Sequence, residues 1–321
     1  MSERISIIDE IKKGGYEASL ITSYNAYLPF YEEVVLRKLI GQGVHHNVLL
    51  MDAAQCAHSV AHHPPRLAGR YYSLVPISSP GAFHPKVILL VGKNKGSLLV
   101  GSHNLTLSGF GYNRELTNLV RLQGSDDDEA VSVLQTAWRH VLAWVESQGN
   151  QLPSHLGEMV LKLQDFAPWL KTDREAVSER FHLLAANPAS PSLWDQLIVN
   201  IEGEVEQVLV AGAFFDAELR FLQRLQEDLR PKETLVAIDP ASVQIPSGLK
   251  VAGVRFVNGG NLGATDKNER TGYLHAKALA IRLSNGEFFL ATGSANPSAP
   301  AWLTCPVNSG HSHLKRPLSE G

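Results

Sequence analysis

The sequence predicts an α/β protein made of two similar lobes, and three observations predict it. The chain has 321 residues, which is about the length of two domains at ~150 residues each. Its composition, 44% hydrophobic and 19% charged, is that of a globular protein and excludes a disordered or fibrous one. The most informative observation is an internal repeat, because one order of strands, helix and polar motif occurs twice, 191 residues apart.

Each copy of the repeat contains the same polar motif on an apolar hairpin. His-x-Lys occurs at residues 84–86 and 275–277, where it opens an apolar segment. After a turn rich in Gly and Asn, a second apolar segment ends in Gly-Ser-x-Asn, at residues 101–104 and 293–296. The His-to-Asn spacing is 20 residues in the first copy and 21 in the second, and a change in the hairpin turn accounts for that difference.

Upstream of each hairpin, the pattern predicts a strand, an amphipathic helix and a second strand. The expected strands are residues 18–22, 47–51, 83–90 and 98–104 in the first half, and residues 207–211, 233–238, 274–281 and 288–296 in the second. Helices are expected at residues 29–40 and 216–229, the second of them capped by Asp216. Strands that alternate with helices are typical of α/β layers.

We place the first lobe at residues 1–124 and the second at residues 191–321, joined by a helical connector at residues 125–190. An acidic run suits the start of a helix that ends near residue 147. Further helix is expected from residue 161 to about 184, before a Pro-rich linker.

The repeated polar residues predict a phosphate-binding site. Residues i and i+2 of a strand point to the same face, so the His and Lys of each motif lie together, with the Asn of the neighbouring strand close by. Two lobes related by a pseudo-twofold axis would bring both sets to the seam between them. Two ammonium groups and two amides suit the oxygens of a phosphate. Two imidazoles, which titrate near neutral pH, can divide nucleophilic attack and proton transfer between them.

This pair of motifs resembles the phospholipase D superfamily, whose members carry two His-x-Lys motifs, each followed by Gly-Ser-x-Asn. The resemblance spans most of the chain and implies cleavage of a phosphodiester through a covalent phosphohistidine, without a metal or another cofactor. It implies that His84 is the nucleophile and that His275 is the general acid and then the base. The residues expected to hold the non-bridging oxygens are Lys86, Lys277, Asn104 and Asn296. Ser102 and Ser294 are expected to support them.

The sequence departs from the family pattern at two places. The commonest motif has an Asp five residues after the Lys, where this sequence has Val91 and Arg282. The form without that Asp resembles the tyrosyl-DNA phosphodiesterase branch and some nucleases, which favours nucleic acid over lipid as the substrate. In family members an acid about thirty residues after one His supports the His of the other lobe. Glu115 follows His84 by 31 residues and is expected to support His275.

The second departure concerns the corresponding acid after His275, because none occurs near residue 306. The segment from residue 304 onward also lacks the strand pattern of the first copy. We therefore expect the chain to be truncated or frame-altered after about Leu303, with loss of the last strand and of the carboxylate for His84. Such a chain would keep its phosphate cradle and lose much of its rate.

The favoured interpretation is a nuclease that cleaves DNA or RNA. Two alternatives stay open: a phospholipase D-type enzyme that acts on lipid phosphodiesters, and a weakened nucleic-acid-binding subunit that binds phosphate without cutting. Trp302, which follows the second motif, is a candidate for stacking on a base. Since the net charge is −3, nucleic acid would have to be bound by a local basic site.

The sequence suits a cytoplasmic protein. Its first residues include acids and no apolar signal-peptide core, and its longest apolar run without Gly, residues 87–91, is too short to span a bilayer. The two cysteines, Cys56 and Cys305, exclude a disulfide framework. One chain holds both motif copies, so a monomer could be complete, while a homodimer or a larger bacterial defence complex stays open.

Overall fold

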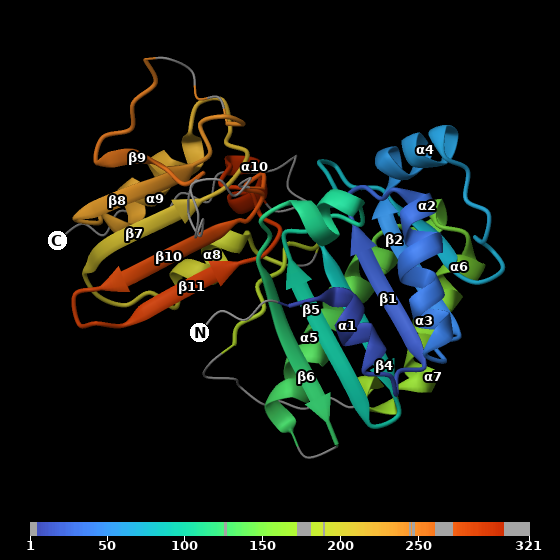
Figure 1. The fold of residues 1–321 in the computed structure, drawn as a ribbon. Coiled ribbons are helices and arrows are strands. Elements are labelled where there is room, and N and C mark those ends of the chain that lie inside the picture. The colour runs from blue at the N-terminus through green and yellow to red at the C-terminus, as the bar shows by residue number, and fades with distance from the viewer. Residues whose placement is uncertain are drawn as a thin grey trace.

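The computed structural model describes residues 5–124, 127–171, 181–188, 190–243, 245, 248–260 and 272–304. The chain forms two α/β lobes, each built on one mixed sheet (Figure 1). The two-lobed α/β architecture expected from the repeat is confirmed.

The first sheet has six strands in the order β3-β2-β1-β4-β5-β6. Its strands are β1 (Ala18–Ser23), β2 (His46–Asp52), β3 (Ser73–Ile77), β4 (Val87–Gly92), β5 (Lys95–Gly101) and β6 (Thr117–Gln123). The central strand β1 pairs in parallel with β2 and antiparallel with β4, and all six of its residues are buried. A strand buried on both faces explains why this segment contains apolar residues and small hydroxyls but no charge.

The second sheet has five strands in the order β11-β10-β7-β8-β9. Its strands are β7 (Val205–Ala211), β8 (Glu233–Ile238), β9 (Val254–Asn258), β10 (Ala278–Leu283) and β11 (Phe288–Thr292). Here β7 pairs in parallel with β8 and antiparallel with β10, which in turn pairs antiparallel with β11.

The two sheets therefore share one connectivity, in which β7 to β11 repeat the order and direction of β1 to β5. The strands expected at residues 18–22, 47–51, 207–211 and 233–238 are confirmed. Within the described residues the second sheet has no counterpart of β6, so β11 lies at its edge.

Helices cover both faces of the first sheet and one face of the second (Figure 1). The helices before β6 are α1 (Ile7–Lys12), α2 (Leu28–Phe30), η1 (Tyr31–Leu36), α3 (Arg37–Gly41), α4 (Ala53–His62) and η2 (Ser108–Tyr112). After β6 come α5 (Asp128–Glu146), η3 (Gly149–Gln151), α6 (Ser154–Leu161), α7 (Leu163–Phe166) and η4 (Pro168–Lys171). The second lobe has α8 (Leu193–Ile198), α9 (Arg220–Leu229) and α10 (Ala299–Trp302). Throughout the described ranges, no helix combines the length and hydropathy of a membrane span.

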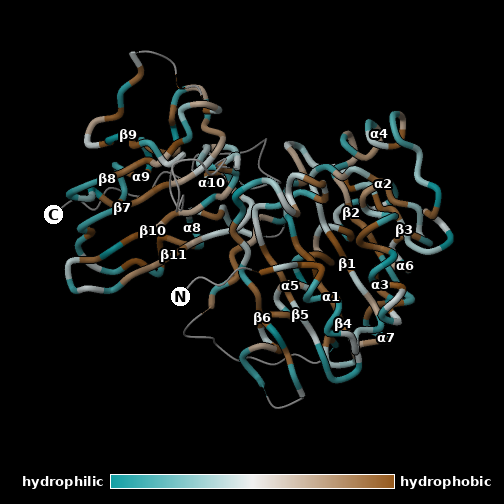
Figure 2. The backbone as a smooth tube through the Cα atoms, viewed as in Figure 1, coloured by the Kyte–Doolittle hydropathy of each residue, from teal (hydrophilic) through white to brown (hydrophobic). Residues whose placement is uncertain are grey.

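The cores follow from this layering. One cluster of buried side chains lies between the first sheet and α5 to α7, a second lies under α1 to α4, and a third lies between the second sheet and α8 to α10. Hydrophobic stretches run along strands of both lobes, for example β1 and β7 (Figure 2). The other face of the second sheet leaves Leu209, Phe288 and Leu290 exposed.

Two of the four helix predictions are confirmed, and two need correction. Helix covers residues 28–41 without a break, as α2, a π-helical turn and α3, and α5 ends within a residue of its expected end. By contrast, the helix expected from residue 161 to 184 is divided into short segments as far as Lys171, residues 172–180 of it lie outside the described residues, and residues 181–184 are not helical. Pro168 cannot continue an α-helix because it lacks an N–H group.

The second correction concerns Asp216, which is not the N-cap residue of α9. The helix begins at Arg220, and its N-cap is Leu219, in the left-handed region at φ 55°. The Asp216 carboxylate still accepts hydrogen bonds from the backbone N–H groups of Arg220 and Phe221. It therefore accepts hydrogen bonds from N–H groups at the start of the helix that have no partner within it, although it lies four residues before Arg220. The helix is four residues shorter than expected.

Glu10 gives a stability prediction for the first lobe. Its buried carboxylate accepts hydrogen bonds from Arg121, Ser97 and Tyr16. Burial alone would raise the pKa of Glu10, but hydrogen bonds from Arg121, Lys13 and Ser97 outweigh it and lower the pKa to about 2. Because the folded pKa is depressed, the stabilisation is present above pH 4.5 and is lost as the pH falls from 4.5 towards 2.

We expect Glu10→Ala to lower the free energy of unfolding by about 2 to 3 kcal/mol at pH 7, because buried donors lose their acceptor. The matched control is Glu33→Ala, which removes an exposed ion pair with Arg37 and should cost less than about 0.5 kcal/mol. Urea denaturation at pH 7 and at pH 3 measures both. An equal loss in the two variants would contradict this account of Glu10.

Candidate active site

The two His-x-Lys motifs lie immediately before the corresponding strands β4 and β10. Residues 84–86 and 275–277 are irregular backbone, so the expectation that they are strand residues is corrected. The His and Lys of the first motif nevertheless lie together, because the Lys86 Nζ is 3.1 Å from both ring nitrogens of His84. The second pair is linked through the backbone, since the Lys277 ammonium donates to the carbonyl of His275.

Backbone hydrogen bonds join the two lobes beside His275. The N–H of Arg114, two residues after η2, donates to the carbonyl of Tyr273 at 2.8 Å. The Arg114 carbonyl accepts from the N–H groups of His275 at 3.1 Å and Ala276 at 2.9 Å. This short parallel bridge holds the residue after Arg114 against the second motif.

That residue is Glu115, and it contacts His275 as the sequence predicted. The Nδ1 of His275 lies 2.9 Å from Oε1 and 3.0 Å from Oε2 of Glu115. Asn113 donates to Oε1 at 3.1 Å, and the Ser102 hydroxyl donates to Oε2. Burial would raise the pKa of Glu115, but the bonds from His275 and Ser102 outweigh it and hold the pKa below its ordinary value. The carboxylate is therefore ionised and fixed in place.

Ser102 thus acts on the carboxylate rather than on the phosphate-binding residues that it was expected to support. Its Oγ also accepts from the N–H of Leu116 at 3.1 Å, which ties the end of β5 to the segment before β6. Gly101 permits this approach, because a Cβ at that position would lie 2.7 Å from the carbonyl oxygen of Leu116. Ser294, its counterpart, makes a backbone hydrogen bond to His84.

His84 lies in a contrasting electrostatic environment. Its ring packs at 4.9 Å from the ring of Tyr24, and burial together with the charges of Lys86 and Lys277 lowers the pKa of His84 to about 2. The imidazole is therefore neutral throughout the physiological pH range, so one of its ring nitrogens carries a lone pair. No described carboxylate bonds to His84, and the place expected for one, near residue 306, lies outside the described residues.

The two lysines are buried cations at the seam. Lys86 is 1% exposed and Lys277 is 2% exposed. Burial lowers the pKa of Lys86 well below its ordinary value and lowers the pKa of Lys277 to about 8. A bound anion would offset the cost of burying these charges, so the site is suited to a phosphate.

Asn104 and Asn296 share an unusual feature. Each has a buried side-chain oxygen without a hydrogen-bond partner, although the two residues lie in different lobes. Buried polar groups are ordinarily satisfied, and exceptions are frequent at functional sites. These oxygens only accept hydrogen bonds, so they would not hold a phosphate oxygen themselves; that role would fall to the Nδ2 donors of the same two amides.

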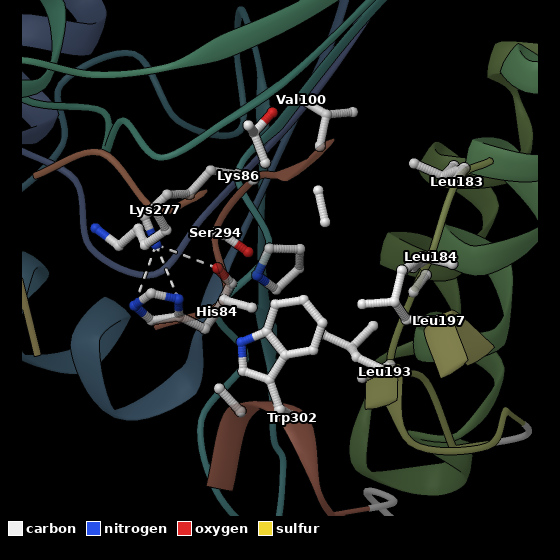
Figure 3. Close-up of a pocket in the computed structure, with 18 of the residues that line it drawn as sticks. His84, Lys86, Val100, Leu183, Leu184, Leu193, Leu197, Lys277, Ser294 and Trp302 are labelled. Carbon is white, nitrogen blue, oxygen red and sulfur yellow. Dashed lines mark hydrogen bonds between the residues drawn. The ribbon is translucent and has the colours of Figure 1, made fainter. Parts of the chain in front are cut away.

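A cavity of about 930 Å³ lies beside this cluster, with walls from both lobes. His84, Lys86, Lys277 and Ser294 line its polar end (Figure 3). Its other walls are mainly apolar and include Leu183, Leu184, Leu193, Leu197 and Trp302 (Figure 3).

Trp302 is a wall of the cavity rather than a platform for a base. Its ring stacks on Phe221 at 5.2 Å and 19°, meets Trp194 edge-on, and is almost fully buried. Since Phe221 covers one ring face and only 6% of Trp302 is exposed, we correct the expected base-stacking role.

Several residues around the site were missed in the sequence. His103 is buried beside Glu115 and Lys86, its pKa is lowered to about 4 by burial, and its Nε2 has no partner. It occupies the variable position of Gly-Ser-x-Asn, which is Ala295 in the second copy, so the repeat gave no signal for it. Tyr273, two residues before His275, and Phe214 pack near the His275 ring.

Two solved structures that resemble this chain are histidine variants of yeast tyrosyl-DNA phosphodiesterase. The first has a TM-score of 0.56 and 11% identity, and the match covers 94% of this chain and 82% of that chain. The second has a TM-score of 0.52 and 11% identity, with 95% and 84% covered. Neither a family model nor a curated relative matches the sequence. The likeness is one of fold and extends over both lobes.

Proposed function

We propose, from the premise that the chain has the two-lobed fold of the phospholipase D superfamily, that it is a metal-independent phosphodiesterase whose substrate is nucleic acid. One observation carries the proposal: a neutral His84 and a carboxylate-paired His275 lie at one seam with two buried lysines. A neutral imidazole suits nucleophilic attack, and a carboxylate-paired imidazole suits proton donation.

In the first step, a ring nitrogen of His84 attacks phosphorus in line with the leaving oxygen. An N–P bond forms, the P–O bond to the leaving group breaks, and the imidazolium of His275 gives its proton to the departing oxygen. Glu115 stabilises that imidazolium through Nδ1. Lys86 and Lys277 stabilise the charge on the non-bridging oxygens, which is typically the largest contribution to such a reaction.

In the second step, the neutral His275 takes a proton from water, and the hydroxide attacks phosphorus opposite His84. The N–P bond breaks, His84 leaves as a neutral imidazole, and a phosphomonoester is released. The proton taken from water restores the imidazolium of His275 for the next cycle. Each histidine therefore returns to the protonation state in which it began the cycle.

Nucleic acid as the substrate is supported by the motif form without the Asp and by the likeness in fold to yeast tyrosyl-DNA phosphodiesterase. A lipid phosphodiester is the second candidate, because the apolar walls of the cavity would suit an acyl chain. A panel of single-stranded DNA, duplex DNA, RNA and phospholipid vesicles, digested in EDTA, separates these functions. We expect cleavage of a nucleic acid; turnover of vesicles alone would favour the second candidate, and cleavage only with Mg²⁺ would reject both.

Lys277 gives a pH prediction. Its ammonium is charged below its pKa of about 8 and loses that charge above it. We therefore expect the KM for metal-free cleavage to rise above pH 8, by roughly tenfold per pH unit. Lys277→Arg keeps the charge at high pH and should abolish this rise, whereas Lys93→Arg at the exposed β4–β5 turn should preserve it. A KM that rises equally in both variants would show that Lys277 is not the group responsible.

A further inference from the structure

The segment that carries His84 and Lys86 is held at its start by a side chain from β2. Residues 83–86 are irregular backbone, so they lack the regular pairing of a strand. The carboxylate of Asp52, at the end of β2, accepts a hydrogen bond from the N–H of Phe83 at 3.0 Å, and the Phe83 ring packs edge-on against Trp144. Asp52 and Phe83 are both buried. The residue before His84 is therefore fixed by buried contacts within its own lobe.

At its end the segment is bonded to the hydroxyl of Thr22, in β1. The Thr22 Oγ1 donates to the carbonyl of Pro85 at 3.0 Å and accepts from the N–H of Val87 at 2.9 Å. These two groups lie on either side of Lys86, so a single oxygen holds the Lys86 backbone from both directions. Thr22 and Val87 are the last register pair of β1 and β4, and the hydroxyl extends the hydrogen bonding of the two strands beyond that pair.

The side chains of the first motif depend on this backbone. The Lys86 Nζ donates to the carbonyl of His84 at 3.1 Å and lies 3.1 Å from both nitrogens of the His84 ring (Figure 3). Removing the Thr22 hydroxyl would leave the Pro85 carbonyl and the Val87 N–H without this partner, which favours a rearranged backbone around Lys86. Since Thr22 is only 3% exposed, it acts on the site through that backbone.

The second lobe has no hydroxyl at the corresponding position. Ala211 and Ala278 are the last register pair of β7 and β10, and they correspond to Thr22 and Val87. The second motif is instead bonded to the opposite lobe, because the carbonyl of Arg114 accepts from two of its N–H groups. The same pair of strands thus forms with alanine at this position. The fold does not need the hydroxyl, and its presence beside the first motif points to a role specific to that motif.

We propose that Thr22 is a positioning residue for the nucleophile. Its hydroxyl fixes the backbone around Lys86, so that the ammonium of Lys86 and the ring of His84 keep the arrangement from which His84 attacks phosphorus. This role in catalysis rests on the proposed function. The placement of the two side chains by Thr22 does not rest on it and can be measured separately.

Four variants of the full chain test the role. Thr22→Val removes the hydroxyl and keeps the branched shape, Thr22→Ala reproduces the residue of the second lobe, and Thr22→Ser keeps the hydroxyl. The matched control is Thr234→Val, because Thr234 is a buried threonine of β8 whose hydroxyl accepts a hydrogen bond from Gln226 at 2.6 Å. Urea denaturation identifies the variants that fold. Thr22→Ala keeps the test decisive if the valine variant does not fold, since the second lobe is built with alanine there.

The placement is tested without using catalysis. In spectra of the ¹⁵N-histidine-labelled chain, the ring signals of His84 are identified by their absence in His84→Ala. We expect these signals to move or split in Thr22→Val and Thr22→Ala and to stay in place in Thr22→Ser and Thr234→Val. Unmoved His84 signals in the variants without the hydroxyl, or an equal movement in Thr234→Val, would overturn the proposal.

The catalytic role is tested by the first turnover of bis(p-nitrophenyl) phosphate at saturating concentration in EDTA. We expect Thr22→Val and Thr22→Ala to lower the rate of p-nitrophenolate release by about 10²-fold, because a small misplacement of reacting groups is enough for such a loss. Thr22→Ser should retain most of the rate and Thr234→Val all of it. Rates in the variants without the hydroxyl that equal the rate of Thr234→Val would overturn the role in catalysis.

Failure of the proposed function gives a different result. A parent chain that releases no p-nitrophenolate, with His84 signals that move as expected, would refute the proposed function and with it the catalytic part of this role. The placement of His84 and Lys86 by Thr22 would then still stand. A parent chain that cleaves the substrate, with hydroxyl-free variants as active as the control, would refute the role of Thr22 alone.

Discussion

His84→Ala is expected to lower metal-free phosphodiester cleavage by at least ~10³-fold, because it removes the atom that forms the bond to phosphorus. The fold should persist, since His84 lies in irregular backbone before β4 and its ring packs on Tyr24 rather than in a core cluster. Initial rates on an oligonucleotide in EDTA measure the loss, and His155→Ala, at an exposed position in α6, is the matched control. Activity within tenfold of the parent chain would refute the assignment of His84.

His275→Ala distinguishes the roles of the two histidines, because only His275 is proposed to protonate the leaving group. Cleavage of an oligonucleotide requires protonation of an alkoxide and should fall as steeply as in His84→Ala. With bis(p-nitrophenyl) phosphate the departing phenolate needs no proton, so the first turnover should persist and the covalent intermediate should accumulate. Equal loss of the p-nitrophenolate burst in the two variants would contradict the division of labour proposed for them.

Glu115→Gln is expected to lower the rate on oligonucleotides by ~10² to 10⁴-fold. The amide preserves shape but carries no charge, so the imidazolium of His275 loses the carboxylate that lies 2.9 Å from its Nδ1. The alkaline limb of the kcat profile should therefore move to lower pH in this variant. Glu158→Gln, at an exposed position of α6, should have no effect.

The alkaline limb identifies the cause of that loss. A merely structural role of Glu115 would lower the rate at all pH values alike, and the activated substrate would suffer as much as the oligonucleotide. The proposed role predicts that bis(p-nitrophenyl) phosphate loses far less than the oligonucleotide in the first turnover. Equal losses on the two substrates would reject Glu115 as the residue that supports the general acid.

The fold was predictable to the extent that it is repeated. A buried strand such as β1 appears in the sequence as a short run of apolar residues. A similar run recurs in β7, at a similar distance before the second His-x-Lys motif. The prediction was wrong where a single group decides local structure. Pro168 cannot continue the α-helical hydrogen bonding, so the chain goes on as the 3₁₀ segment η4, and the Asp216 carboxylate accepts hydrogen bonds from the first N–H groups of α9 although it lies outside that helix. Neither effect changes the spacing of apolar residues, so the pattern gave no warning.

The sequence predicted which residues lie at the candidate site better than it predicted what each of them contacts. The repeat identified both histidines and both lysines, and the spacing of Glu115 identified its contact with His275. The role of Ser102 was not predictable, because its bonds to Glu115 and Leu116 depend on how β5 approaches β6. The burial of Trp302 depends on Phe221 and Trp194, which lie far from it in sequence. His103 was missed because only one copy of the repeat has it.

The central claim is that His84 attacks the phosphorus atom while His275 acts as the general acid and then as the base. Trapping the covalent intermediate tests this claim most directly. The full chain is mixed with an oligonucleotide in EDTA, quenched in alkaline detergent because phosphohistidine is acid-labile, and digested for mass spectrometry. The account predicts a phosphoryl adduct on His84 that decays at the rate of turnover, and in His275→Ala an adduct that accumulates with bis(p-nitrophenyl) phosphate but not with the oligonucleotide. An adduct on His275, or turnover with no adduct on either histidine, would contradict it.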